Sequence, residues 1–232
     1  MGKAAIEIQG VTKYFGEEMI LKNITHTFES GKIHGIVGMN GSGKTVLLKC
    51  ICGFLHPSEG KILVEGKWIG KETDFPESLG MIIETPGFLP NLSGRENLKI
   101  LASLRGKIGR EEIQEAMQKV GLDFSSRKPV KNYSLGMRER LGIAQAIMED
   151  PHIIILDEPF NGLDKNGVQE VYRIIQDLKN EQRTILLVSH NRVDIETLCD
   201  TVCEMELGAG FYEMNCSFIE RKDRIFYRRE NR

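Results

Sequence analysis

Residues 38–45 read Gly38-Met39-Asn40-Gly41-Ser42-Gly43-Lys44-Thr45, which fits the pattern G-x-x-x-x-G-K-[ST] of a phosphate-binding loop. A short β-prone run, Lys32–Val37, precedes it, and Val46–Cys52 can continue it as a helix. A strand, a glycine-rich loop and a helix in this order bring free backbone N–H groups and a helix N-terminus together around an anion. We expect Lys44 to reach the β- and γ-phosphates of a nucleotide and the Thr45 hydroxyl to ligate Mg²⁺.

The composition is that of a globular protein with a sizeable core. The chain has 232 residues, of which 41% are hydrophobic and 28% are charged, enough for one large domain. Its formal net charge of −2 gives no support to a nucleic-acid partner. Apolar runs such as Ile153–Leu156 are far shorter than the roughly 20 residues that cross a bilayer. Met1–Ala4 is not followed by the apolar core of a signal peptide.

The five cysteines are an odd number, which favours a reducing cytoplasm over a disulfide framework. Cys199 and Cys203 are spaced i, i+4, so they could share one face of a helix. No histidine and no second cysteine pair stands at ligand spacing, so packing is favoured over metal binding for these two residues.

The N-terminal third is rich in predicted strands. Ala5–Gln9 alternates apolar and polar residues, Ile20–Phe28 is also strand-like, and Lys61–Ile69 is typical of a hairpin about Gly66. Lys13–Gly16 is expected to form a turn that carries two adjacent aromatic residues.

The middle of the chain changes to helices. Ser93 and Glu96 form the capping-box pattern of a helix through about Leu104, and Glu111–Val120 has helical periodicity. Ser134 can cap a third helix to about Met148. We therefore expect a helical subdomain at about residues 88–148, inserted in an α/β core.

The last third alternates strands and helices again, as an α/β sheet requires. The expected elements are a buried strand at Ile153–Leu156, a helix after Asp164, a strand at Thr184–Ser189, a helix at Asn191–Cys199, a hairpin at Val202–Met214 about Gly208–Gly210, and a peripheral, weakly helical tail at about 216–232.

Two carboxylates follow the apolar run Ile153–Leu156 directly. The C-terminal edge of a parallel strand is where open α/β sheets bind ligands, so Asp157 is placed to hold Mg²⁺. Glu158 would orient or deprotonate an attacking water. Ser134 and Gly136 open a helix and could form a second anion site, although taken alone they indicate no more than an N-cap.

The order of these motifs resembles an ABC-type ATPase subunit: the loop 38–45, then Ser134-Leu135-Gly136-Met137, Asp157-Glu158, Gly162-Leu163-Asp164 and His190. The resemblance covers residues 4 to 207. It implies a P-loop NTPase (RecA-like) α/β core with an N-terminal antiparallel β subdomain and an inserted α-helical subdomain. Together these would make residues 1–232 a single ABC ATPase domain.

The resemblance also implies roles for individual residues. Ser134 and Gly136 match the signature loop, which binds the γ-phosphate of ATP held by the other subunit, and Asp164 matches the D-loop at that interface. His190 matches the switch histidine that contacts the γ-phosphate. Phe15 falls at the aromatic residue that stacks on adenine, with Tyr14 as its alternative.

Two departures from the family pattern stand out. The signature usually reads Ser-Gly-Gly-Gln, whereas this chain has Leu135 and Met137 at the second and fourth places. Glu84 stands where the family normally has a glutamine. It still offers an oxygen to Mg²⁺, but it adds a negative charge and loses an N–H donor. With residues 85–92 after it, Glu84 is similar to the ATPases of bacitracin-resistance and lantibiotic-immunity exporters.

The resemblance predicts a subunit that binds ATP and Mg²⁺ and hydrolyses ATP by in-line attack of water. It would pair head to tail with a second ATPase subunit, expected to be an identical chain, and drive a separate polytopic permease at the cytoplasmic face of a bacterial membrane. The expected substrate is an antimicrobial peptide of the bacitracin or lantibiotic type.

Three other functions compete with this prediction. One is an ABC exporter subunit for another substrate, and another is a soluble ABC ATPase acting on the ribosome or nucleic acid. The latter is disfavoured by the single cassette, the lack of a heptad insertion and the lack of basic excess. The last is a regulator that does not hydrolyse, which the presence of Lys44, Asp157, Glu158 and His190 disfavours.

Overall fold

The computed structural model describes residues 3–84, 86–207 and 212–218. Within these residues one sheet holds ten strands in the order β5-β4-β1-β2-β10-β9-β3-β8-β7-β6. One end of the sheet is antiparallel and consists of β1 (Ala4–Phe15), β2 (Glu18–Glu29), β4 (Glu59–Val64) and β5 (Lys67–Trp68). This end is the predicted N-terminal β subdomain.

The other end is a parallel sheet. It consists of β3 (Ile33–Gly38), β6 (Leu79–Ile82), β7 (Ile153–Asp157), β8 (Thr184–Val188) and β9 (Thr201–Leu207). Strand β10 (Tyr212–Phe218) pairs antiparallel with β9 and touches β2, so it joins the two ends. The phosphate-binding loop follows β3 and the two carboxylates end β7, with β8 between these strands.

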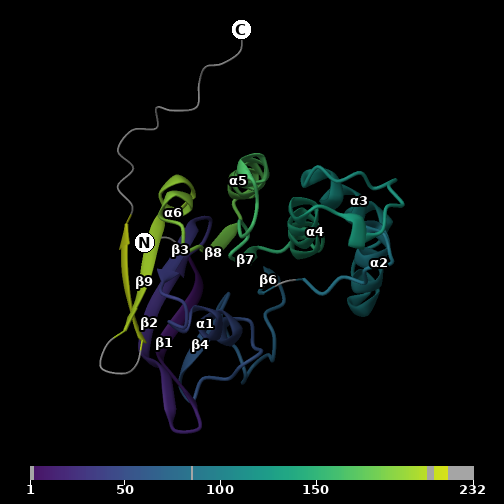
Figure 1. The fold of residues 1–232 in the computed structure, drawn as a ribbon. Helices are drawn as coiled ribbons and strands as arrows, with labels where there is room; N and C mark the ends of the chain where they lie inside the picture. Colours follow the sequence, from purple (N-terminus) through teal and green to yellow (C-terminus); the bar gives the residue numbers. More distant parts are fainter. Residues whose placement is uncertain (1–2, 85, 208–211, 219–232) are drawn as a thin grey trace.

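Both faces of the parallel sheet are covered (Figure 1). Helix α1 (Lys44–Ile51) packs on one face, and α5 (Lys165–Asn180) and α6 (Arg192–Leu198) pack on the other. Successive side chains of β7 divide between the two cores: Ile154 packs with α5 and α6, whereas Ile155 packs with α1 and the antiparallel strands. Burial on both faces explains why this strand is a continuous apolar run.

The helical part consists of α2 (Gly94–Arg105), α3 (Arg110–Lys119), a 3₁₀ turn (Val130–Asn132) and α4 (Leu135–Ile147), which lie to one side of the sheet (Figure 1). The capping box of Ser93 and Glu96 is present, as predicted. Helix α4 lies directly against β6, because a Cβ at Gly80 would come within 1.8 Å of the Ala146 carbonyl oxygen. The α/β fold with a β subdomain and helices inserted between strands is confirmed.

Several local predictions are wrong. Strand β1 continues through Phe15, so the turn contains only Gly16 and Glu17. Cys199 follows the end of α6 and Cys203 lies on β9, so they share no helix face. Cys203 is disulfide-bonded, against the expectation from the odd cysteine count.

The C-terminal predictions fall partly outside the described residues. The hairpin of β9 and β10 is present, but its expected apex at Gly208–Gly210 lies outside them. Strand β10 extends to Phe218, into the segment expected to be a helical tail, and residues 219–232 also lie outside the described residues.

Candidate nucleotide-binding site

The phosphate-binding loop connects the end of β3 to the first residue of α1. Gly43 precedes the helix with φ 83°, and no side chain caps the N–H groups of the first turn. Because the first N–H groups of a helix have no partner within the helix, they are available to an anion. The backbone of the loop and of the first turn of α1 thus contributes to an anion site.

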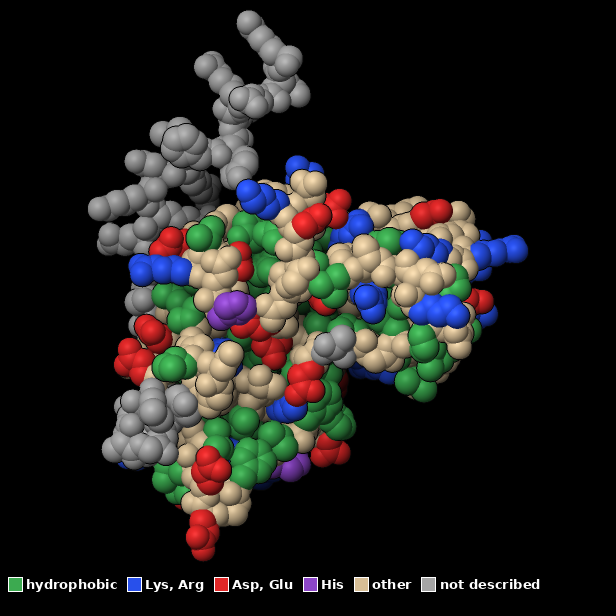
Figure 2. Space-filling model, in the orientation of Figure 1, with side chains coloured by type: hydrophobic (Ala, Val, Ile, Leu, Met, Phe, Trp, Pro, Cys, Tyr) green, Lys and Arg blue, Asp and Glu red, His purple; other side chains and the backbone are tan. Residues whose placement is uncertain are grey.

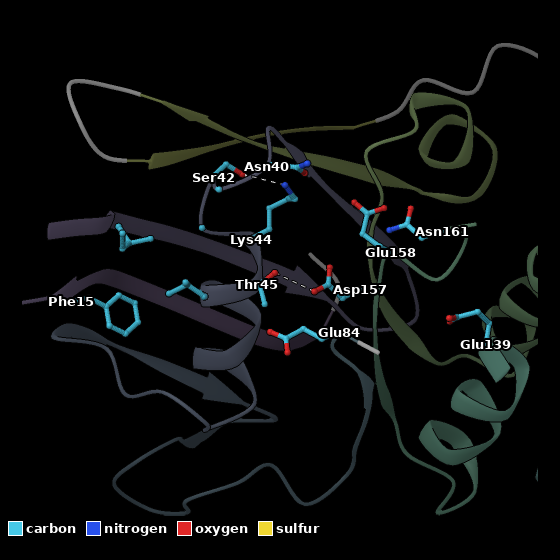
Figure 3. A pocket seen from close by; sticks show the side chains of 14 residues that line it. Phe15, Asn40, Ser42, Lys44, Thr45, Glu84, Glu139, Asp157, Glu158 and Asn161 are labelled. Atoms are coloured by element: carbon cyan, nitrogen blue, oxygen red, sulfur yellow. Dashed lines mark hydrogen bonds between the residues drawn. The ribbon is translucent and has the colours of Figure 1, made fainter. Parts of the chain in front are cut away.

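A pocket of about 480 Å³ opens at this loop. Figure 3 shows that its polar side chains come from four places: the loop and α1, the end of β6, the end of β7 and helix α4. The pocket is lined by Phe15, Ile20, Asn40, Gly41, Ser42, Gly43, Lys44, Thr45, Val46, Glu84, Glu139, Asp157, Glu158 and Asn161. The fold therefore brings residues from distant parts of the sequence to one edge of the sheet.

Lys44 is held over the loop by the loop's own backbone. It is only 8% exposed, and its ammonium donates to the carbonyl oxygens of Gly38 at 2.8 Å and Met39 at 2.9 Å. Burial lowers the pKa of Lys44, and the negative charges of Glu158 and Asp157 oppose that shift. The position suits a cation that neutralises bound phosphate.

Thr45 and Asp157 contact each other in the lining of the pocket. The Thr45 hydroxyl donates to Asp157 Oδ2 at 3.2 Å (Figure 3). Burial raises the pKa of Asp157 and the charges of Glu158 and Glu84 raise it further, although the Thr45 hydrogen bond and Lys44 act against the shift. A hydroxyl and a partly desolvated carboxylate are hard oxygen donors, so they fit Mg²⁺.

Glu158 and His190 form a pair beside the loop. Glu158 Oε2 lies 2.8 Å from His190 Nδ1, and the Glu158 N–H donates to the Val188 carbonyl at 2.9 Å. Glu158 has φ +54°, a left-handed conformation that costs energy for a non-glycine residue. His190 lines a second groove of about 1030 Å³, together with Asn40, Glu158 and Asn161. This second groove thus continues from the loop past the end of β7.

Glu84 follows β6 and stands at the rim of the pocket, also in a left-handed conformation with φ +63°. Its Oε1 accepts a hydrogen bond from Lys49 Nζ at 2.7 Å. Figure 3 shows its carboxylate near Thr45 and Asp157. Among the described residues, Lys44 is the single lysine that lines the pocket, and several acidic side chains line it too.

Of the two adjacent aromatic residues, the structure brings Phe15 to the pocket. Phe15 is 46% exposed at the end of β1, and the Lys13 ammonium lies 5.2 Å from its ring centroid. Tyr14 is not among the residues that line the pocket. An exposed ring at the pocket wall can stack on a base, so the geometry favours Phe15 over Tyr14.

The predicted signature and D-loop residues lie apart from this pocket. Ser134 caps α4, and its hydroxyl accepts a hydrogen bond from the Met137 N–H at 3.2 Å. Asp164 caps α5 in the same way, accepting from the Gly167 N–H at 2.8 Å. Ser134, Gly136 and Asp164 line neither the nucleotide pocket nor the groove beside it. In the described part of the chain, these three residues therefore lie outside the lining of both cavities.

Sequence reasoning missed three residues near the pocket. Asn161 lines both cavities, and its place three residues after Glu158 was the available signal. Glu139 faces the pocket from α4, and burial raises its pKa. Lys49 pairs with Glu84, and its spacing of four residues from Thr45 on α1 could have indicated a shared helix face.

A parallel α/β sheet with a phosphate-binding loop, and with acidic side chains at the carboxyl ends of the neighbouring strands, defines the P-loop nucleoside triphosphatases. Comparison with known proteins narrows the class. Residues 21–161 match the family model described as "ABC transporter". The chain belongs to this family, and it is an ATP-binding subunit of an ABC transporter with an ATPase domain.

Two relatives carry transport names. The "Bacitracin transport ATP-binding protein BcrA" of Enterococcus faecalis is 39% identical over 95% of this chain and 72% of its own length. The "Lantibiotic transport ATP-binding protein SrtF" of Streptococcus pyogenes is 37% identical over 95% of each chain.

Solved structures share the fold. The cbiO1 protein from Clostridium perfringens, titled part of the ABC transporter complex cbiONQ, matches with a TM-score of 0.79 and 26% identity over 90% of this chain and 87% of that one. A dimeric post-hydrolysis state of the ATP-binding cassette MJ0796, bound to ADP and Pi, has a TM-score of 0.77 at 22% identity over 92% and 98% of the two chains.

Proposed function

We propose that this chain powers an exporter of antimicrobial peptides of the bacitracin or lantibiotic type, through a separate membrane permease. The convergence of Lys44, Thr45, Asp157 and Glu158 on one pocket supports the ATPase part of the proposal, with His190 contacting Glu158 from the adjoining groove. The substrate class is supported by the names of two relatives that are 39% and 37% identical to this chain.

Within the site, Lys44 and the N–H groups of the loop and α1 bind the phosphates, and Phe15 stacks on the adenine. Thr45, Asp157 and Glu84 hold Mg²⁺, which when bound neutralises charge on the β- and γ-phosphates. Glu158 accepts a proton from the attacking water and orients it in line with the γ-phosphate. His190, which already contacts Glu158, holds that carboxylate in place and reaches the γ-phosphate from the adjoining groove.

A second copy of the chain completes the site. Ser134, Gly136 and Asp164 lie outside the pocket of their own chain, so we assign them to the ATP held by the partner. Residues 88–148 contain eleven Lys and Arg against six Asp and Glu, a formal charge of +5 (11 − 6) within a chain of net charge −2. In Figure 2 the blue side chains gather over α2, α3 and α4. This positive subdomain complements an acidic pocket and its bound triphosphate.

The permease contact lies near residues 84–92 and the helical subdomain. Leu89 is 50% exposed, and Ile100 and Leu104 on α2 are 43% and 77% exposed. In the described part of the chain, no helix is both long and apolar enough to span a membrane. We place the chain at the cytoplasmic face of a bacterial membrane, because its named relatives are bacterial transport ATP-binding proteins.

The proposal is tested in a strain that lacks the chain, complemented with the wild type or with Glu158→Gln. We expect the wild type, but not the variant, to restore resistance to bacitracin or to a lantibiotic. Purification of the tagged wild type from detergent-solubilised membranes should recover a polytopic membrane protein. Recovery of ribosomes or DNA in its place, or equal resistance in the two strains, would overturn the proposal.

A further inference from the structure

Glu84 adds negative charge where the nucleotide pocket already has much of it. Asp157, Glu158 and Glu139 line the same pocket, whereas Lys44 is the only lining residue with a positive charge among those described. ATP itself carries several negative charges, and each further carboxylate nearby weakens its binding by Coulomb repulsion. The pocket has four lining carboxylates against this one lysine, so a further cation beside Glu84 would reduce the repulsion.

Lys49 lies where such a cation is needed. Its Nζ is 2.7 Å from Glu84 Oε1, with the two side chains 34% and 65% exposed. Lys49 and Thr45 are four residues apart on α1, so they share one face of the helix. Helix α1 thus presents Thr45 to Asp157 and, one turn later, Lys49 to Glu84. The two carboxylates beside the loop are each held by a residue of the same helix.

We propose that Lys49 is a positioning residue for the nucleotide site, which neutralises Glu84 and fixes its carboxylate at the pocket rim. Lys49 donates to Oε1 of Glu84, which leaves Oε2 to ligate Mg²⁺. This Mg²⁺ role of Glu84 rests on the proposed function. With Lys49 in place, the Lys49–Glu84 pair has a net charge of zero. Without Lys49, the rim gains an uncompensated negative charge beside the triphosphate.

A purely structural ion pair predicts a different outcome. Exposed ion pairs contribute little to stability, so the loss of one that merely ties α1 to the segment after β6 would leave nucleotide affinity unchanged. The matched control is Lys67, which pairs with Glu77 at 2.8 Å. Neither residue is among those that line the nucleotide pocket. A comparison of these two pairs separates the local electrostatic effect from the general effect of breaking a surface pair.

The test is calorimetric titration of the full chain with ATP in EDTA and with ATP in excess Mg²⁺, at low salt. We expect Lys49→Met to weaken the binding of metal-free ATP by roughly threefold to tenfold, as for one added charge near the ligand. Lys49→Arg and Lys67→Met should bind like the wild type. The ATP affinity of the double variant Lys49→Met/Glu84→Gln should return to within about twofold of the wild-type value. In 0.5 M salt the loss of affinity in Lys49→Met should be smaller, because salt screens the added charge.

Two results would overturn the proposal. One is wild-type ATP affinity in Lys49→Met; the other is a loss that Glu84→Gln does not rescue, which would mean that Lys49 acts directly on ATP or on the fold. Thermal melts of each variant identify the folding case. Neither result touches the transport proposal, because resistance and permease recovery are measured with Lys49 intact.

Discussion

Helices α1 and α4 each offer a helix N-terminus to an anion, but the two N-termini have different surroundings. Helix α1 follows Gly43 and helix α4 follows Ser134, and the N-terminal N–H groups of a helix suit an anion. At α1 no side chain caps the helix, and Lys44, Asp157 and Glu158 converge on its start. At α4 the Ser134 hydroxyl caps the helix, and the start is exposed.

The difference shows that an anion site needs a supporting shell as well as a helix N-terminus. The α1 site receives that shell from the sheet edge of its own chain. Ser134 and Gly136 at the start of α4 line neither of the two cavities in the described part of the chain, although they lie in a subdomain of formal charge +5 (eleven basic, six acidic residues). We infer that the pocket at α1 and the loop at α4 are two halves that only a second subunit brings together.

The largest effect is expected from Glu158→Gln. Removal of the carboxylate that accepts the proton of water should lower ATP turnover by at least about a hundredfold, the usual contribution of general-base catalysis. ATP affinity, measured by titration with Mg²⁺ present, should remain near the wild-type value because Lys44 and the loop are intact. Turnover at the wild-type rate would remove Glu158 from the mechanism.

Mixing two defective variants tests whether the pocket at α1 and the loop at α4 act together from two different subunits. Lys44→Ala damages only the α1 site and Ser134→Glu only the α4 loop, so each alone should hydrolyse little ATP. In an equal mixture half of the dimers contain both variants, and each such dimer has one intact composite site. The steady-state rate should therefore recover to about a quarter of the wild-type rate. No recovery in a mixture that still forms dimers would mean that each chain works alone.

The smallest effect concerns the stability of the chain without nucleotide. The pKa of Asp157 is raised in the folded state, so the folded chain holds this proton more tightly than the unfolded chain does. Stability from this group therefore falls as pH rises from its ordinary value of 3.8 through the raised value. At pH 7 Asp157→Asn should raise Tm by about 2 °C.

Asp164→Asn is the control for that measurement. An asparagine is as good an N-cap as an aspartate, so the exposed cap of α5 should keep its stability. The Tm values come from thermal unfolding followed by circular dichroism. A lower Tm in Asp157→Asn would contradict the view that burial makes this carboxylate costly in the absence of a metal.

The features that the sequence could predict are those that depend on local signals. Residues 38–45 and Ile153–Asp157 carry local signals, a glycine pattern and a continuous apolar strand, so both the elements and their meeting point were foreseeable. The capping residues Ser93 and Ser134 act within three or four residues and were foreseeable for the same reason.

What was missed depends on strand pairing and on contacts between distant residues. Strand β1 continues through Lys13–Phe15 because Glu18–Leu21 pairs with it, although taken alone this stretch resembles a turn. The contact of β10 with β2 and the ion pair of Lys49 with Glu84 link residues far apart in the chain. No local periodicity records such partners, because the fold alone decides which surfaces meet.

The central claim is that Ser134 of one subunit completes the ATP site of another. Its most direct test is the mass of the Glu158→Gln chain in solution, by light scattering with and without ATP. We predict a shift from 26.2 kDa to twice that mass on addition of ATP, and no shift when Ser134→Glu is added to the same chain. A mass that stays at 26.2 kDa in saturating ATP would contradict the claim. So would a dimer that still forms when Ser134→Glu is present.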